Sequence, residues 1–357
     1  MLGWRLGASV ARFATYETAV MKCVVTGAAG FIGSFLCERL LADGHEVTGL
    51  DAFIPYYAPA IKRRNQTEAL CHPRYRFHAL DLRHDPLGPA LAGAEVVFHL
   101  AATPGLVQSW TDFDGYWSCN VLATQRLLEA LRLERGPLRR LVYASTSSVY
   151  GAYASGDEML PTRPISPYGV TKLAGENLCR AYLEAHGLPV VVLRYFSVYG
   201  PRQRPDMGYH RFIRAFLRGE PVTVNGDGQQ ARGNTFIDDC VAATVAAVEA
   251  IPGETYNVGG GETATVWDVL HHLEALSGRE AVVRRAAARP GDQRHTCADT
   301  AKLRRHFGWE PRTLLSEGLA RQWAWQERER TFEADPPSLG LAARPLPTRL
   351  LDPRVPT

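Results

Sequence analysis

From residue 22 to residue 196, short apolar runs alternate with longer stretches in which apolar residues recur at helical spacing. Val and Leu almost fill the short runs, which is typical of strands buried on both faces of a sheet. Repeated alternation of strand and helix therefore predicts an α/β protein with a doubly wound parallel sheet. The expected strands are 22–27, 45–51, 76–81, 94–102, 139–146 and 188–196, and the expected helices are 31–44, 120–134 and 167–186.

The domain organisation is expected to change after residue 196, where Pro and Gly become frequent. A further helix and strand follow within 232–260, and we expect them to rejoin the sheet. Ligands of open α/β sheets bind outside the carboxyl ends of the strands, where a second lobe would close over them. The predicted units are an N-terminal extension at 1–20, a main domain at 21–196 to which 232–260 returns, a smaller substrate-binding lobe at 197–231 and 261–330, and a proline-rich tail at 331–357.

Composition excludes several functional classes. The chain has 46% hydrophobic and 22% charged residues, which is ordinary for a globular protein. A net charge of +3 over 357 residues is too weak to indicate a nucleic-acid surface. No apolar run reaches the length needed to span a membrane. The seven cysteines show no metal-ligand spacing, so we predict no metal site and a reduced, cytoplasmic protein.

A glycine-rich turn, "TGAAGFIG", joins the first expected strand to the first expected helix. Its glycines, Gly27, Gly30 and Gly33, allow a tight turn, and the following helix would offer free N–H groups to a pyrophosphate. Asp51 ends the second strand, where a carboxylate would bind both hydroxyls of an adenosine ribose and repel a 2′-phosphate. The spacing G-x-x-G-x-x-G is weak evidence alone. In this context it predicts a Rossmann-type site for NAD rather than NADP.

A wider set of residues is predicted to surround this cofactor. Asp81 and Leu82 follow the third strand, where they would border the adenine. Ala101 and Ala102 end the fourth strand, where small side chains would let the backbone approach the cofactor. For these four residues a purely structural role is an equal alternative. The remaining candidate cofactor contacts are Phe31, Ile32, Leu100, Asn120, Tyr168, Lys172 and Tyr195.

Tyr168 and Lys172 stand four residues apart in "SPYGVTKLAGE", which places them on one face of a helix, one turn apart. A free phenol has a pKa of about 10 and is a poor base at neutral pH. A nearby ammonium and an oxidised nicotinamide would lower that pKa, so that Tyr168 could take a proton from a sugar or alcohol hydroxyl. The alternative is an ordinary surface pair. Hydroxyl side chains at 145–148, which end the fifth strand, favour the catalytic interpretation.

Several ordered motifs now support one family. They are "TGAAGFIG", "FHLAA", "YASTSSVYG", "YGVTK", "LRYFSVYGPRQRPD" and "RPGDQRHTCADTAKLRRHFGW". From about residue 21 to 325 the sequence resembles the extended short-chain dehydrogenases/reductases, specifically the NAD-dependent nucleotide-sugar epimerases and dehydratases. This resemblance implies that Thr146, Tyr168 and Lys172 are catalytic, with Tyr168 as the base. It also implies a homodimer formed through the helices at about 107–134 and 167–186.

The resemblance also bears on the sugar. The family's dehydratases carry Asp-Glu after the catalytic Thr, whereas this chain has Ser147 and Ser148, which argues against dehydration. Segments 50–64 and 196–207 resemble those of members acting on UDP-glucuronate, in which an arginine, here Arg204, meets the sugar carboxylate. The implied activity is 4-epimerisation between UDP-glucuronate and UDP-galacturonate. Alternatives are decarboxylation to UDP-xylose, which usually requires Glu at position 148, and 4-epimerisation of another UDP-sugar.

The resemblance implies three groups of substrate contacts, the first of which is a loop at Pro104 and Gly105 that would line the sugar pocket. Hydroxyls near the base and the Arg204 guanidinium would hold the sugar carboxylate close to the plane of the 4-keto group, which would prevent loss of CO₂. Charged residues of the C-terminal half would bind the nucleotide diphosphate, although a structural ion pair is the alternative for each. The candidate substrate contacts are Pro104, Gly105, Thr146, Ser147, Ser148, Ser197, Arg204, Arg232, Arg289 and Asp292.

A protein of a different class, a redox-sensing regulator without catalysis, is a further alternative. It is disfavoured because Thr146, Tyr168 and Lys172 are all present.

Overall fold

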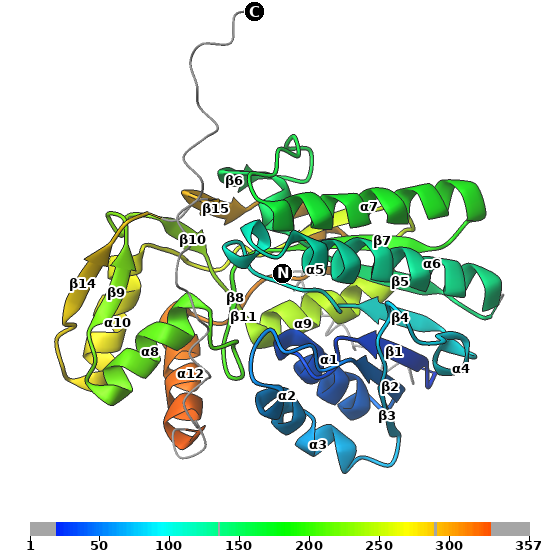
Figure 1. The fold of residues 1–357 in the computed structure, drawn as a ribbon, viewed down its shortest axis with the longest axis horizontal. Helices are drawn as coiled ribbons and strands as arrows, with labels where there is room; N and C mark the ends of the chain where they lie inside the picture. The colour runs from blue at the N-terminus through cyan, green and yellow to red at the C-terminus, as the bar shows by residue number, and fades with distance from the viewer. Residues whose placement is uncertain (1–18, 135, 289–290, 330–357) are drawn as a thin grey trace, which may run out of the picture.

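A seven-stranded parallel sheet forms the centre of the computed structural model, which describes residues 19–134, 136–288 and 291–329 (Figure 1). The strand order is β12-β7-β5-β4-β1-β2-β3. The chain leaves β1 toward β2 and β3, and then returns to place β4 on the other side of β1. This reversal defines a doubly wound sheet and confirms the predicted fold class. The strands are β1 (Lys22–Thr26), β2 (Glu46–Asp51), β3 (Tyr75–Ala79), β4 (Val96–His99), β5 (Arg140–Thr146), β7 (Val190–Tyr195) and β12 (Thr255–Val258).

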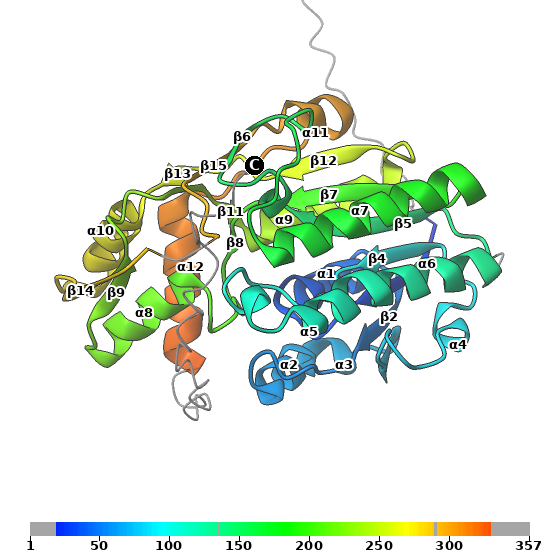
Figure 2. The ribbon, with the colours of Figure 1, turned by 45° about the horizontal axis from the view of Figure 1, so that its top comes forward.

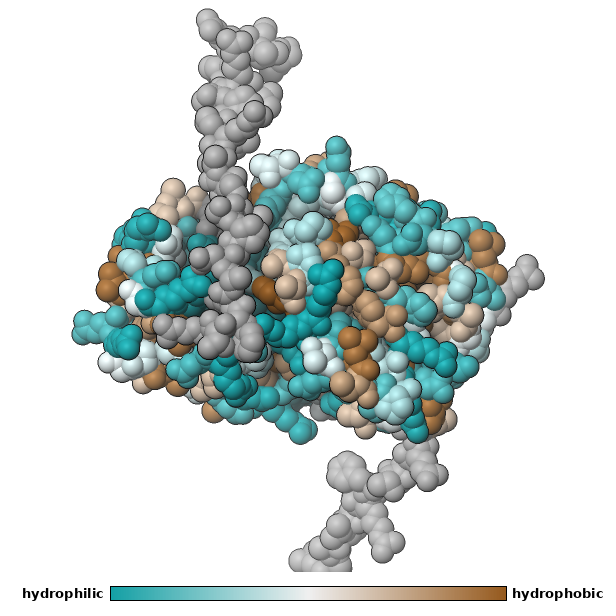
Figure 3. Space-filling model, turned by 60° about the horizontal axis from the view of Figure 1, so that its bottom comes forward, coloured by the Kyte–Doolittle hydropathy of each residue, from teal (hydrophilic) through white to brown (hydrophobic). Residues whose placement is uncertain are grey.

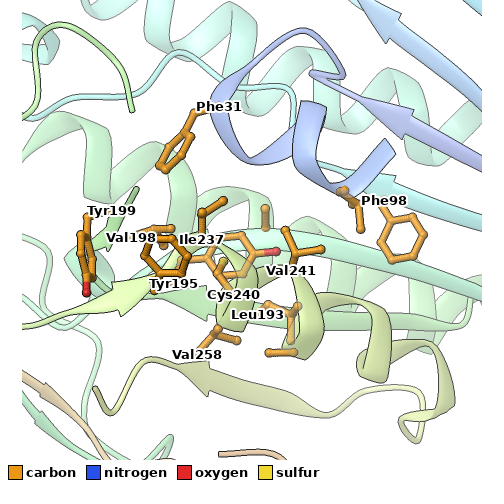
Figure 4. Close-up of a cluster of buried hydrophobic side chains, with 14 of the residues drawn as sticks. Phe31, Phe98, Leu193, Tyr195, Val198, Tyr199, Ile237, Cys240, Val241 and Val258 are labelled. Atoms are coloured by element: carbon orange, nitrogen blue, oxygen red, sulfur yellow. The ribbon is translucent and has the colours of Figure 1, made fainter. Parts of the chain in front are cut away.

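Helices cover both faces of this sheet, as the alternation of apolar runs predicts. Neighbouring residues of β1 separate the two faces, since Val25 packs in the cluster that contains α1 and α9, and Val24 packs in the cluster that contains α6 and α7. Figure 2 shows α5, α6 and α7 together on one side of the sheet. Figure 4 shows residues of α9 against Leu193 and Val258 on the other side. The helices are α1 (Phe31–Ala42), α2 (Pro59–Asn65), α3 (Thr67–Leu70), α4 (Gly88–Leu91), α5 (Phe113–Trp117), α6 (Ala123–Glu134), α7 (Pro167–His186) and α9 (Ile237–Ala246).

Helix α7 begins and ends where local chemistry dictates. The Ser166 side chain accepts a hydrogen bond of 3.1 Å from the backbone N–H of Gly169, which caps the helix N-terminus. Pro167 occupies the first turn, where its missing N–H costs nothing. Gly187 ends the helix with φ of 69°, in the left-handed region. These signals place Tyr168 in the first turn of α7 and Lys172 one turn later.

Smaller sheets and the remaining helices form a lobe beside the carboxyl ends of the main strands (Figure 1). β6 lies within the range predicted for the main domain, but it pairs with β15 in this lobe. The sequence pattern does not indicate this pairing, because the two strands are far apart along the chain. The strands are β6 (Tyr153–Gly156), β8 (Val198–Tyr199), β9 (Val222–Asn225), β10 (Ala231–Gly233), β11 (Thr235–Phe236), β13 (Thr263–Ala264), β14 (Val283–Ala286) and β15 (His295–Ala298). The helices of the lobe are α8 (Gly208–Arg218), α10 (Val266–Ser277) and α12 (Leu315–Glu329), whereas α11 (Ala301–Phe307) packs against β12 at the edge of the main sheet.

The surface of the described region mixes polar and apolar residues on the face drawn in Figure 3. None of the helices in residues 19–134, 136–288 and 291–329 has the length and apolar character to cross a membrane. The predicted extension at 1–20 falls largely outside the described residues, and the tail at 331–357 falls wholly outside them.

Candidate active site

The glycine-rich turn after β1 passes against the carboxyl end of β4. Gly27 has φ of 71°, and a Cβ atom on it would lie 2.8 Å from the backbone nitrogen of Ala101. A Cβ on Gly33 would collide with the carbonyl of Gly27. Gly30 caps α1 without a side-chain hydrogen bond, so the first N–H groups of the helix remain available. The turn therefore has the close approach and the helix terminus that suit a dinucleotide pyrophosphate.

One cavity extends from this turn, past the ends of β2 and β4, to the start of α7. Almost all of the residues predicted to bind the cofactor line this cavity. Those lining it are Gly27, Gly30, Phe31, Ile32, Gly33, Asp51, Asp81, Leu82, Leu100, Ala101, Ala102, Tyr168, Lys172 and Tyr195. Of the residues predicted to bind substrate, Pro104 and Arg204 also line it.

Asn120 lies outside the lining of this cavity and is fully buried. Its side-chain oxygen accepts a hydrogen bond of 2.7 Å from the Thr103 N–H. Its amide nitrogen donates to the Thr103 carbonyl and to the Thr171 hydroxyl, each at 3.0 Å. Asn120 thus ties the loop after β4 to α7, a supporting contact that its sequence position did not indicate.

Asp51 faces the cavity from the end of β2, and its carboxylate already has partners. It accepts hydrogen bonds from the backbone of Ala29 at 3.2 Å and of Phe53 at 2.7 Å. Lys62 of α2 lies 3.3 Å from the same carboxylate and also lines the cavity. Sequence reasoning missed Lys62 because nothing local shows that α2 folds back over β2. Asp81, by contrast, is paired with Arg83, whose hydrogen bonds lower the pKa of the Asp81 carboxyl.

Of the three residues predicted to be catalytic, Thr146 ends β5, and Tyr168 and Lys172 lie in the first two turns of α7. Burial raises the pKa of the Tyr168 phenol, whereas the Arg204 guanidinium and a hydrogen bond with Thr146 oppose that rise. Burial lowers the pKa of Lys172 to about 8, and its Nζ lies 4.3 Å from the centre of the Tyr143 ring. Arg204 is therefore a second cation near the phenol that the helical spacing did not indicate, and Lys172 lines the same cavity one turn further along α7.

The hydroxyl residues after β5 form a tight turn. The Thr146 hydroxyl accepts a hydrogen bond of 3.2 Å from the Ser148 N–H and lies 3.3 Å from the Ser148 hydroxyl. The Ser147 hydroxyl donates to the side-chain oxygen of Gln293 at 3.2 Å. Ser197 lies beyond the end of β7, where its carbonyl accepts a hydrogen bond from Thr235 at 3.0 Å. Gln293 was not singled out by the sequence, since it joins this turn from the distant lobe.

Arg204 enters the cavity with its charge partly balanced. It forms two hydrogen bonds of 3.0 Å with the Asp206 carboxylate, through Nε and Nη2. The Tyr56 hydroxyl lies 3.3 Å from that carboxylate, and the Arg204 guanidinium lies 5.7 Å from the centre of the Tyr56 ring. Gly105 packs against the Tyr56 hydroxyl, where a side chain would collide. Arg204 retains Nη1 and the second hydrogen of Nη2 for a further acid group.

Two residues of the lobe that are predicted to bind the nucleotide form an ion pair with each other. Arg232 of β10 lies 2.7 Å from Asp292, which precedes β15. Neither residue lines the cavity described above. Arg289 lies outside the described residues. Among the described residues, no group of three or more His, Cys, Asp or Glu side chains is arranged to hold a metal ion.

Comparisons with known proteins agree with this geometry. The sequence model of the NAD dependent epimerase/dehydratase family matches residues 23–259. A Bacillus subtilis protein named as an uncharacterized UDP-glucose epimerase, YtcB, is 44% identical over 85% of this chain and 98% of its own length. A UDP-glucuronate 4-epimerase of Thermodesulfobacterium geofontis is 34% identical over 85% of this chain and 95% of its own.

A solved structure gives the same result. The UDP-glucuronic acid 4-epimerase of Bacillus cereus, in complex with UDP-glucuronic acid and NAD, is 43% identical. It superposes with a TM-score of 0.84 and covers 86% of this chain and 99% of its own. The chain belongs to the NAD-dependent epimerase/dehydratase family.

The depressed pKa of Lys172 can be tested directly, because lysine occurs only at Lys22, Lys62, Lys172 and Lys302. In protein without bound nucleotide, we expect one lysine side chain to lose its proton with a midpoint near pH 8, so that its charge is present below that pH. NMR titration of labelled lysine side chains measures this midpoint. The signal should vanish in Lys172→Met. If all four lysines titrated near their ordinary value of about 10.4, Lys172 would not be desolvated.

Proposed function

We propose that this protein is a UDP-glucuronate 4-epimerase, which interconverts UDP-glucuronate and UDP-galacturonate. The observation that carries this proposal is the position of Arg204. Its guanidinium lines the same cavity as Tyr168 and opposes the rise in the pKa of the Tyr168 phenol that burial causes. A permanent cation beside the base suits a sugar with a carboxylate next to the reacting carbon. The substrate named for the Bacillus cereus structure supports the same assignment.

NAD suits the cofactor site because the glycine turn, the free terminus of α1 and the Asp51 carboxylate match its pyrophosphate and ribose hydroxyls. When bound, NAD supplies hydride chemistry by accepting a hydride from C4 of the sugar and later returning it. Its positive charge in the oxidised state would also lower the pKa of the Tyr168 phenol.

The proton of the C4 hydroxyl is assigned to Tyr168. In its ionised form the phenol accepts this proton as the 4-keto sugar forms. Thr146 hydrogen-bonds the phenol and would orient the C4 oxygen beside it. The 4-keto sugar must then turn within the site so that its opposite face is reduced, and Tyr168 returns the proton to the new C4 hydroxyl. NAD is unchanged overall, so none needs to be added.

The carboxylate must be restrained throughout this cycle. A 4-keto uronic acid is a β-keto acid, and it loses CO₂ when the bond to its carboxylate stands perpendicular to the carbonyl plane. Arg204 would hold the carboxylate near that plane through the hydrogens that Asp206 leaves free. Ser148 carries no carboxyl group that could assist decarboxylation, and dehydration lacks the acid pair that would follow Thr146.

The second candidate is 4-epimerisation of UDP-glucose, which is favoured by the name of the Bacillus subtilis relative. A neutral hydroxymethyl group on the sugar would leave the free edge of the Arg204 guanidinium without a charged partner. Burial of an incompletely paired cation is unfavourable, so the site should prefer the uronic acid.

Incubation of the purified protein with UDP-glucuronate, without added NAD, should yield UDP-galacturonate and no UDP-pentose on anion-exchange chromatography. Tyr168→Phe should lower kcat by about 10²- to 10⁴-fold, the usual contribution of general acid–base catalysis, while UDP binding persists. A UDP-pentose as the main product would establish the decarboxylase instead. Turnover of UDP-glucose alone would establish the second candidate.

Arg204→Ala should raise KM for UDP-glucuronate by about 10- to 100-fold, the effect of losing hydrogen bonds to a charged group. It should also release CO₂ during turnover, because the carboxylate is no longer held in plane. Arg202→Ala is the matched control, since Arg202 lies in the same loop and pairs with Glu38 at 2.7 Å. Unchanged kinetics and products in Arg204→Ala would remove this residue from the site.

We also propose a cytoplasmic homodimer. All seven cysteines are free thiols, as suits a reducing compartment. Apolar side chains that are 43–50% exposed gather on the elements packed around α5 and α7, and an exposed apolar surface of this kind favours association. They are Trp110, Phe113, Trp117, Leu122 and Val170.

Trp117→Glu should convert the dimer to a monomer in sedimentation velocity, because a charge would then be buried in this apolar surface. Leu314→Glu is the control, since Leu314 is 58% exposed but lies in the other lobe. A monomeric parent protein, or a Trp117→Glu variant that remains dimeric, would contradict this interface.

A further inference from the structure

Gln293 is a buried polar residue that connects the lobe to the catalytic turn. Only 7% of it is exposed. Its amide nitrogen donates to the carbonyl of Ser147 at 3.2 Å and to the carbonyl of Gly151 at 2.7 Å. Its side-chain oxygen accepts the hydrogen of the Ser147 hydroxyl at 3.2 Å. The reversed amide would aim an oxygen at two carbonyls, which cannot donate, so the hydrogen bonds determine this orientation.

This arrangement changes what Ser147 can do. A hydroxyl has one hydrogen, and that of Ser147 is used on Gln293. A carboxylate only accepts hydrogen bonds, so Ser147 has nothing left to donate to a uronic acid. The Thr146 hydroxyl donates to the Ser148 hydroxyl at 3.3 Å, which leaves the hydrogen of the Ser148 hydroxyl for the carboxylate. The hydroxyl of Ser147 therefore serves to hold the turn, and the carboxylate must rely on its neighbours and on Arg204.

Along the chain, Gln293 is adjacent to a residue that is predicted to bind the nucleotide. Asp292 precedes it and pairs with Arg232 at 2.7 Å. The next residue, Arg294, donates a backbone hydrogen bond of 3.0 Å to Ala152, at the far end of the same turn. Residues 292–294 thus form a short bridge between Arg232 and the turn at 147–152. Gly151 adopts φ of 95° within that turn, a conformation that is open to glycine and that would be strained for other residues.

We propose that Gln293 is a positioning residue which holds Thr146 and Ser148 in the orientation that keeps the sugar carboxylate in plane, and so suppresses decarboxylation. The suppressed step breaks the C5–C6 bond of the 4-keto sugar. Its electron pair passes to the C4 carbonyl as an enolate, CO₂ leaves, and C5 takes a proton to give a UDP-4-keto-pentose. This inference rests on the proposed 4-epimerase function and adds a specificity element to it.

The test compares Gln293→Met with Gln326→Met. Methionine approximates the volume of glutamine but cannot form these hydrogen bonds. Gln326 is a matched control because it is 4% exposed and also donates to a backbone carbonyl, that of His210 at 3.1 Å, within the lobe. The first readout is UDP-pentose formed per UDP-galacturonate formed, a ratio that does not depend on the folded fraction. The second is hydrogen exchange of backbone amides at 147–152.

Loss of these hydrogen bonds should raise the product ratio in Gln293→Met from below the detection limit in the parent protein to at least about tenfold above that limit, and the amides at 147–152 should exchange faster. UDP affinity should change by less than about threefold, because the Arg232–Asp292 pair is kept. Gln326→Met should match the parent protein in both readouts. An unchanged ratio in Gln293→Met, or unchanged exchange at 147–152, would overturn the proposal.

The two proposals can fail separately. If the parent protein does not epimerise UDP-glucuronate, the proposed function fails, and the carboxylate role of Gln293 fails with it. If the parent protein epimerises UDP-glucuronate and Gln293→Met keeps the parent's product ratio, only the role of Gln293 is wrong.

Discussion

Burial of the central sheet on both faces is the constraint on which the rest of this structure depends. Because Val24 and Val25 pack into different hydrophobic clusters, both sides of β1 must be covered by helices. Helical crossovers keep the strands parallel, so their carboxyl ends meet along one edge. The glycine turn, Asp51 and Thr146 lie at that edge although they are far apart in sequence. The cavity follows from the topology rather than from any one motif.

Electrostatics within the cavity link substrate choice to catalysis. Arg204 is the residue proposed to bind the sugar carboxylate, and the same guanidinium opposes the rise in the pKa of Tyr168 that burial causes. Asp206 balances part of its charge, and Arg204 in turn helps to hold the pKa of the Asp206 carboxyl below its usual value despite burial. A uronic acid that binds Arg204 would reduce the positive field at Tyr168. The charge of oxidised NAD would then become the main influence that favours the phenolate.

Much of the scaffold could be predicted from local chemistry. The bounds of α7 match the predicted helix at 167–186, since Ser166, Pro167 and Gly187 are strong end signals. The expected strands agree with the observed ones within a few residues, because apolar runs of β-branched residues identify buried strands. The helix expected at 120–134 is interrupted near its start, where residues 118–122 form a π-helical turn before α6. That irregularity carries no signal in the apolar pattern.

The sequence by itself determined the fold class, the family, and the positions of Tyr168, Lys172 and the glycine turn, because each depends on contacts within a few residues along the chain. Only the tertiary structure decided which groups act on them. Lys62 lies beside Asp51, the Arg204 guanidinium opposes the rise in the pKa of Tyr168 that burial causes, and Gln293 accepts the hydrogen of the Ser147 hydroxyl. These contacts join elements that are distant in sequence. The packing of the lobe and of the helices determines which side chains meet. The spacing of side chains along one element does not indicate that packing.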